Sequence, residues 1–147
     1  MSSHQISAAR SRERNFFRVF WWAFLACPVF YGVAGCFLEV GEGHDMILLV
    51  LALAAAVTFT MSFLIKRLLA ENALARDQED RSRGEAKFPN RLAGVMIVVW
   101  VLTESVGVFG LVARFFGADM KTLLGFIGLA LVGMLLHRPP RGAEEVA

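Results

Sequence analysis

One acidic side chain stands out among the residues that could do chemistry. Glu104 lies near the middle of an otherwise uncharged apolar run from Leu92 to Ala113. A run of this length can cross a bilayer as a helix, and a carboxylate at that depth costs about 2.5–3.5 kcal/mol even on lenient insertion scales. We therefore expect Glu104 to face protein or water and to be neutral unless a cation or hydrogen-bond donors compensate. Its chemistry would be the binding and release of a proton or of Na⁺.

Polar partners for Glu104 are few. If the second and third apolar runs pack antiparallel, Thr58 falls about one helical turn from Glu104, and Tyr31 of the first run lies slightly to the other side of it. Thr58 and Tyr31 are thus the nearest polar candidates for an ion-binding site. Thr103 and Ser105 flank the acid but point elsewhere and can bond to their own helix. The alternative is a neutral carboxyl that donates one interhelical hydrogen bond and has no transport role.

The rest of the sequence carries no recognisable catalytic arrangement. It contains no phosphate-binding glycine loop, catalytic triad, paired-carboxylate motif or zinc-ligand spacing. Cys27 and Cys36 are too far apart on one expected helix to bond to each other, and we interpret both as buried small hydrophobes. We expect neither an enzyme nor a bound metal or cofactor.

Composition places Glu104 in a membrane protein. Hydrophobic residues make up 56% of the chain and charged residues 19%, which is unusual for a soluble domain. The apolar residues form four runs, each close to the length that spans a bilayer. These runs are about 16–38, 46–65, 92–113 and 120–136. We predict an all-α, single-domain membrane protein covering 1–147, with four transmembrane helices.

Residues at the ends of the runs support this division. Asp45, Asn90 and Asp119 can each cap the helix that follows, and Gly117 suits the left-handed residue that ends a helix. Only the second run lacks a stop signal. We therefore expect its helix to continue into a cytoplasmic connection at about 66–90.

That connection has charged pairs at helical spacing. Asp77 with Arg81 and Glu79 with Arg83 are four residues apart with the acid first, the favourable order on a helix face. We interpret the segment as a solvated helical stalk. A docking surface for a soluble partner is the alternative.

Basic residues predict the orientation of the chain, because cytoplasmic flanks retain Lys and Arg during insertion. The N-terminal flank, the second connection and the C-terminal tail hold nearly all of them, and the first connection holds none. Both termini should therefore be cytoplasmic in a multi-pass protein of the cell (inner) membrane. The basic residues are explained by topology, so we expect anionic lipid rather than nucleic acid as their partner.

The first run has three further features. Val33-Ala34-Gly35-Cys36 looks like a lipoprotein cleavage box, but the run is longer than a typical signal core, and we expect a retained helix. Pro28 should kink that helix. Aromatic residues at its cytoplasmic end are expected to anchor it at the membrane interface. These residues are Phe16, Phe17, Trp21 and Trp22.

Around Glu104 the sequence resembles a known family. Residues 102–113 read Leu-Thr-Glu-Ser-Val-Gly-Val-Phe-Gly-Leu-Val-Ala. Glu104, Gly107 and Gly110, with the Leu-Val that follows, are similar to the ion-binding outer helix of subunit c, the rotor-ring proteolipid of ATP synthases and V-type ATPases. The similarity extends at most over residues 46–115. It implies a hairpin with a cytoplasmic loop and a carboxyl that binds a proton or Na⁺ in an oligomer.

Glycines on the last two runs suggest how the helices associate. Gly107 and Gly110 on the third run, and Gly125 and Gly128 on the fourth, allow close approach and van der Waals contact, the main association force in lipid. We expect them to join these two helices, or one copy to another. Four helices could scarcely surround a hydrophilic pathway, so a transport role implies a homo-oligomer or other membrane subunits. A structural or assembly subunit without ion binding is the alternative function.

Overall fold

The computed structural model describes residues 3–38, 45–83 and 91–138, and these form four α-helices with no strand. They are α1 (Ser3–Phe37), α2 (Asp45–Ser82), α3 (Arg91–Phe115) and α4 (Met120–Leu136). The all-helical fold is confirmed, and the bounds of α3 and α4 agree with the predicted runs to within two residues.

The first two helices are longer than their apolar runs. α1 begins at Ser3 and passes through Pro28 without a break. α2 continues to Ser82, which confirms that the second run extends as one helix. Its 38 residues correspond to roughly 57 Å of length, about twice the thickness of bilayer hydrocarbon. The absence of a helix breaker before Gly84 explains the continuity.

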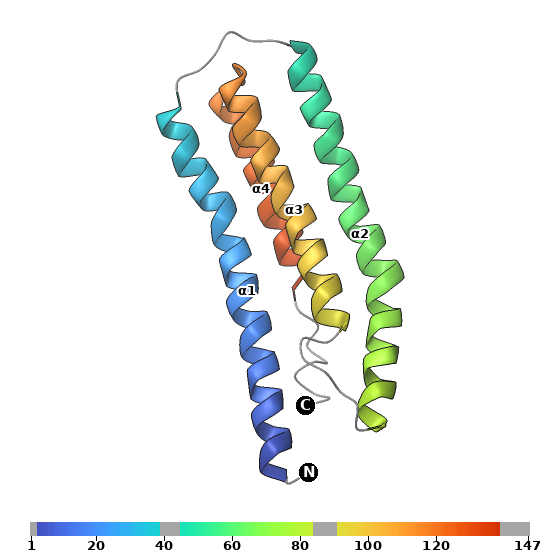
Figure 1. Cartoon of the computed structure of the whole chain (residues 1–147). Coiled ribbons are helices and arrows are strands. Elements are labelled where there is room, and N and C mark those ends of the chain that lie inside the picture. The colour runs from blue at the N-terminus through green and yellow to red at the C-terminus, as the bar shows by residue number, and fades with distance from the viewer. Residues whose placement is uncertain (1–2, 39–44, 84–90, 139–147) are drawn as a thin grey trace.

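α3 is the central helix of the bundle. Consecutive helices run antiparallel, and Figure 1 shows α3 between α1 and α2, with α4 behind it. α3 packs against all three neighbours, whereas α1 packs against α3 and α4 and has little contact with α2. α1 starts, α2 ends, α3 starts and α4 ends at the lower end of the bundle as drawn in Figure 1.

The turn between α3 and α4 follows the sequence prediction. Gly117 has a φ of 94°, the left-handed conformation that favours glycine. The Asp119 carboxylate accepts a hydrogen bond from the backbone N–H of Thr122 at 2.8 Å and so caps α4. This hydrogen bond lowers the pKa of Asp119.

The start of α3 is held by a residue that sequence reasoning assigned elsewhere. The buried Asp77 carboxylate, on α2, accepts from the backbone N–H groups of Arg91 at 3.1 Å and Leu92 at 2.9 Å. Asp77 therefore caps α3. Asn90, the cap expected from the sequence, lies outside the described residues. The predicted ion pair between Glu79 and Arg83 is present.

Two apolar clusters form the core. The cluster at the lower end surrounds the fully buried Trp100 and consists of Phe17, Trp21, Ala73, Leu92, Ala93, Met96, Trp100 and Met134. The second, higher in the bundle, contains Ala55, Val106 and Ala130. Phe17 and Trp21 are thus core residues, and the prediction that they anchor the chain at an interface is wrong. The reason is that α3 and α4 cover this side of α1, whereas Trp22 on the other side is 59% exposed.

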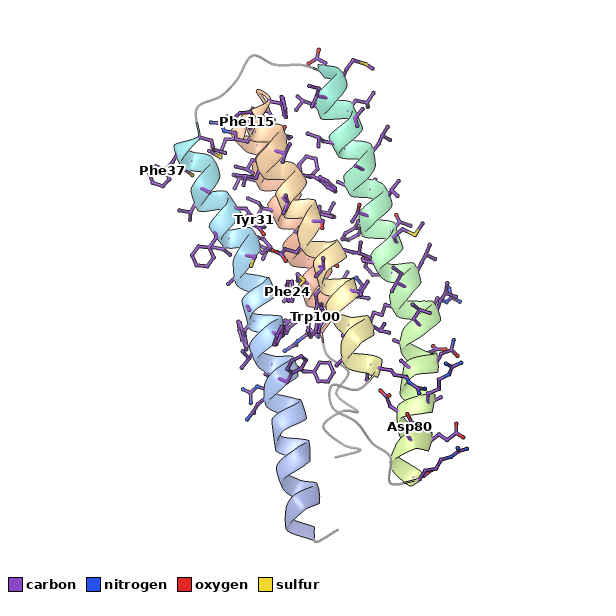
Figure 2. All side chains as sticks on the ribbon, in the orientation of Figure 1. Phe24, Tyr31, Phe37, Asp80, Trp100 and Phe115 are labelled. Carbon is purple, nitrogen blue, oxygen red and sulfur yellow. The ribbon has the colours of Figure 1, made fainter. Side chains whose placement is uncertain are left out.

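The surface of the bundle is strongly apolar. Phe30 is 69% exposed and Phe37 84% exposed on α1, and Figure 2 shows Phe37 pointing away from the other helices. Within the described residues, α1, α2 and α3 each contain a segment long and apolar enough to cross a membrane. These segments are Asn15–Phe37, Asp45–Asp80 and Arg91–Phe115, and α4 is shorter at 17 residues.

Candidate functional site

Glu104 lies on α3 at its contact with α1, and its carboxyl has a hydrogen-bond partner on α1. That partner is Tyr31, whose phenolic O–H donates to Glu104 Oε1. Figure 2 shows Tyr31 directed from α1 toward α3. The two side chains are partly buried. The structure therefore brings together Glu104 and one of its two predicted partners.

Packing of α1 against α3 brings Tyr31 to this position. Pro28 is fully buried, and a Cβ added to Gly107 would lie 3.7 Å from the Pro28 Cβ and 3.2 Å from Tyr31 Cδ2. A larger residue than glycine at position 107 would push α1 outward. Cys27 is one helical turn before Tyr31 on the same face, so its thiol also lies near Glu104.

Thr58, the other predicted partner, does not contact the carboxyl. Its hydroxyl donates to the backbone carbonyl of Ala54 on its own helix at 2.7 Å. Thr103 and Ser105 also bond to their own helix, as expected. A threonine hydroxyl in a helix can bond to the carbonyl four residues earlier, so it needs no partner on α3.

Close helix contact occurs at some of the predicted glycines and not at others. A Cβ at Gly110 would lie 2.5 Å from the Phe126 Cβ, so this glycine brings α3 and α4 together. Gly125 and Gly128 have nothing within 4 Å of such an atom. The expectation that they join α4 to α3 is not met, because they point to the outside of the bundle. Gly133 makes that contact, since its added Cβ would lie 2.6 Å from Thr103 Cγ2.

The two cysteines were expected to be buried, and only part of this holds. Cys27 is partly buried at the α1–α3 contact, while Cys36 is exposed and donates to the carbonyl of Gly32.

Within the described part of the chain, no group of three or more His, Cys, Asp or Glu side chains could hold a metal ion. Comparison with models of protein families, with curated proteins and with solved structures found no significant match.

A second polar centre, which sequence reasoning missed, lies at the C-terminal end of α4. Each of the other three helices donates one hydrogen bond to a backbone carbonyl at the end of α4. Trp21 Nε1 of α1 donates to the Met134 carbonyl at 3.1 Å. Lys66 Nζ of α2 donates to Leu136 at 2.9 Å, and Trp100 Nε1 of α3 to His137 at 2.9 Å. Carbonyls at a helix end have no partner within the helix, so these donors satisfy them.

We give the name α4 junction to five residues: Trp21, Ser62, Lys66, Trp100 and His137. The His137 ring is fully buried against α2, with its Nε2 3.0 Å from Ser62 Oγ and its centroid 4.4 Å from that of Phe63. Its Nδ1 is buried, and no residue that the structure describes hydrogen-bonds to it. Burial, and to a smaller degree the Lys66 ammonium, lower the pKa of His137 to about 4.

One sequence signal could have pointed to the α4 junction. His137 directly follows an apolar run and precedes Arg138 and two prolines, the usual position of a residue that ends a helix. Its contacts with Ser62 and Trp100 could not be inferred, because those residues are far away in the sequence.

Proposed function

We propose that this chain is a multi-pass integral membrane protein that reversibly binds a proton at Glu104. The hydrogen bond from Tyr31 to Glu104 carries this proposal. It gives a carboxyl within an apolar helix one donor from a neighbouring helix, so the charged form has a partner. Glu104 is only partly buried in the bundle.

The membrane location is supported by the exposed apolar surface. Large hydrophobic side chains are exposed along all four helices, which would lead to aggregation in water. In a bilayer the same surface is solvated by lipid. α4 spans roughly 26 Å and is a little short for bilayer hydrocarbon of about 30 Å, so we propose a fourth span that begins near Met120 and ends at the α4 junction.

The charge distribution supports cytoplasmic termini. Within the described residues, most basic side chains belong to the lower end of the bundle, and Arg114 and Lys121 to the upper end. Labelling of single cysteines in intact cells tests the orientation. A cysteine at Asp80 should be protected and one at Asp119 labelled. The reverse result would refute the proposed orientation.

A proton fits the site better than Na⁺. A bound Na⁺ needs several oxygen ligands, whereas Tyr31 supplies the one described oxygen bonded to Glu104, and Thr58 bonds to its own helix. Tyr31 also lies outside residues 46–115, the stretch that resembles the rotor-ring proteolipid. The site we propose is therefore complete for a proton within one copy, and Na⁺ binding would require oxygens from a second copy.

A structural role is the second candidate, and the same hydrogen bond favours it. Tyr31 ties α1 to α3, and such bonds are worth about 0.6 kcal/mol on average in membrane bundles. In that case Glu104 would stay protonated and never exchange its proton. The chain would then act as an assembly subunit that contacts other membrane proteins through its outer helix faces.

Replacement of Glu104 separates the two functions. Glu104→Gln keeps shape and hydrogen-bonding capacity but cannot release a proton. Carbodiimide, which reacts with protonated carboxyls, should label position 104 of the wild-type protein in lipid, lose this reactivity as the pH rises, and leave position 104 of Glu104→Gln unlabelled. Labelling of position 104 that does not change with pH would exclude proton exchange and leave the structural role.

Tyr31→Phe is the matched variant that tests the hydrogen-bond donor to Glu104. It keeps the ring that packs against Gly107 and removes only the donor to Glu104. Under the proton-binding proposal it changes the pH midpoint of labelling. Under the structural alternative it lowers stability by about 0.6 kcal/mol and leaves the labelling independent of pH.

A further inference from the structure

The α4 junction contains a titratable group with no role in the Glu104 site. His137 is fully buried between α2 and α4, and its backbone carbonyl accepts the Trp100 indole N–H. Around it, the first three helices each donate one hydrogen bond to the end of α4. A change in the state of His137 therefore acts where all four helices meet.

The hydrogen bonds around Ser62 define which ring nitrogen carries the proton. Ser62 has one hydroxyl hydrogen, and it donates to the Phe59 carbonyl at 2.7 Å. The 3.0 Å contact with His137 is then a bond from Nε2–H to Ser62 Oγ. Nδ1 then carries the lone pair, and within the described part of the chain it is buried without a partner. A second proton would have to sit on Nδ1, where no described residue accepts it.

Charged groups near His137 oppose this second proton. On α2, the Lys66 ammonium is anchored to the Leu136 carbonyl and repels a cationic ring. Arg138 follows His137 directly and lies over the Trp21 ring of α1, with its guanidinium carbon 5.5 Å from the ring centroid. α3 contributes the uncharged Trp100. No carboxylate interaction with His137 is found within the described residues.

From this geometry we propose that His137 is a pH-sensitive latch: the neutral ring holds the end of α4 against α2 and α3, and protonation of Nδ1 releases it. The closed junction excludes the imidazolium because Nδ1 has no acceptor among the described residues and Lys66 is adjacent. The open junction lets water solvate the ring. Acid therefore favours opening, and the three hydrogen bonds from Trp21, Lys66 and Trp100 are lost together.

The size of the effect follows from the two protonation states. Burial and Lys66 lower the pKa of His137 to about 4 in the closed junction, and its ordinary value in water is 6.5. The closed form thus binds fewer protons, and opening becomes easier as the pH falls below 6.5. At about pH 5.5 the opening equilibrium should be roughly tenfold larger than at neutral pH.

Hydrogen exchange of the indole N–H groups measures this opening in the intact protein. In lipid nanodiscs, the Trp100 and Trp21 indole signals report the junction by NMR, and the exposed Trp22 provides an internal reference. His137→Gln is the matched control, since its amide can still donate to Ser62 but does not titrate. The ratio of exchange rates between wild type and His137→Gln should be constant near neutral pH. It should rise about tenfold by pH 5.5 for Trp100 and Trp21.

Two results would overturn the latch. One is a ratio for Trp100 that does not change between about pH 7.5 and 4.5, which shows that protonation does not open the junction. The other is a ¹⁵N spectrum, assigned by comparison with His137→Gln, in which His137 gains its second proton while Trp100 stays protected. Ser62→Ala, which removes the acceptor of Nε2–H, should raise the exchange of Trp100 already at neutral pH.

Discussion

Removal of the Asp77 carboxylate should destabilise the protein far more than removal of its neighbour Asp80. Asp77 is buried and accepts two backbone N–H groups at the start of α3, from Arg91 and Leu92. Asp80 pairs with the Arg91 side chain at 3.4 Å, and the two side chains are 36% and 54% exposed. The two acids thus lie one helical turn apart, and both contact Arg91. Asp77 accepts a hydrogen bond from its backbone N–H, whereas Asp80 forms an ion pair with its side chain.

The expected magnitudes can be worked from these contacts. A hydrogen bond to a charged group contributes about 1.5–3 kcal/mol, and loss of a helix N-cap costs about 0.5–2 kcal/mol. Because water can partly replace the lost acceptor, we expect Asp77→Ala to cost about 2–4 kcal/mol. An exposed ion pair contributes about 0–1 kcal/mol, which is the expected cost of Asp80→Ala. Asp77→Asn should fall between them, since its amide keeps one acceptor oxygen.

Equilibrium unfolding in mixed micelles with a denaturing detergent measures these differences. Amide exchange at Leu92 provides a local readout, because its N–H bonds to Asp77 Oδ2 at 2.9 Å and should lose protection in Asp77→Ala alone. Equal destabilisation by Asp77→Ala and Asp80→Ala would refute the assignment of Asp77 as the cap. Unchanged protection of Leu92 in Asp77→Ala would refute it independently.

The remaining predictions concern helix contact and capping. Gly110→Ala should cost about 1–3 kcal/mol in the same unfolding assay, because its Cβ would lie 2.5 Å from the Phe126 Cβ. Gly125→Ala, with open space around it, should be neutral or slightly stabilising, and equal costs would contradict the packing described for α3 and α4. Asp119→Ala should cost about 0.5–2 kcal/mol and speed amide exchange at Thr122, whereas Asp119→Asn should restore most of the cap.

Local sequence signals were sufficient to predict the helices and most of their ends. Apolar runs of spanning length identified the three long helices, α1, α2 and α3. Gly117 and Asp119 located the turn between α3 and α4. The continuity of α2 followed from the absence of a breaker. These features depend on residues close together in the sequence, so propensity and capping determine them.

The partner of Glu104 was only partly predictable. Depth along the helices placed Tyr31 and Thr58 near the acid, because rise per residue is fixed. Rotation about the helix axes decided between them, and the packing of Pro28 against Gly107 turns Tyr31 toward Glu104. That packing depends on the shapes of two helices distant in sequence.

The sequence by itself determined that this chain forms apolar helices with one acid in the middle of the third. Tertiary structure decided which polar groups meet, and it used Asp77 as a cap and buried His137 with Trp21, Ser62, Lys66 and Trp100 at the end of α4. The physical reason is that unpaired N–H and C=O groups at helix ends must find partners when they are buried. Those partners come from whichever helix lies beside them, and only the packed bundle determines that.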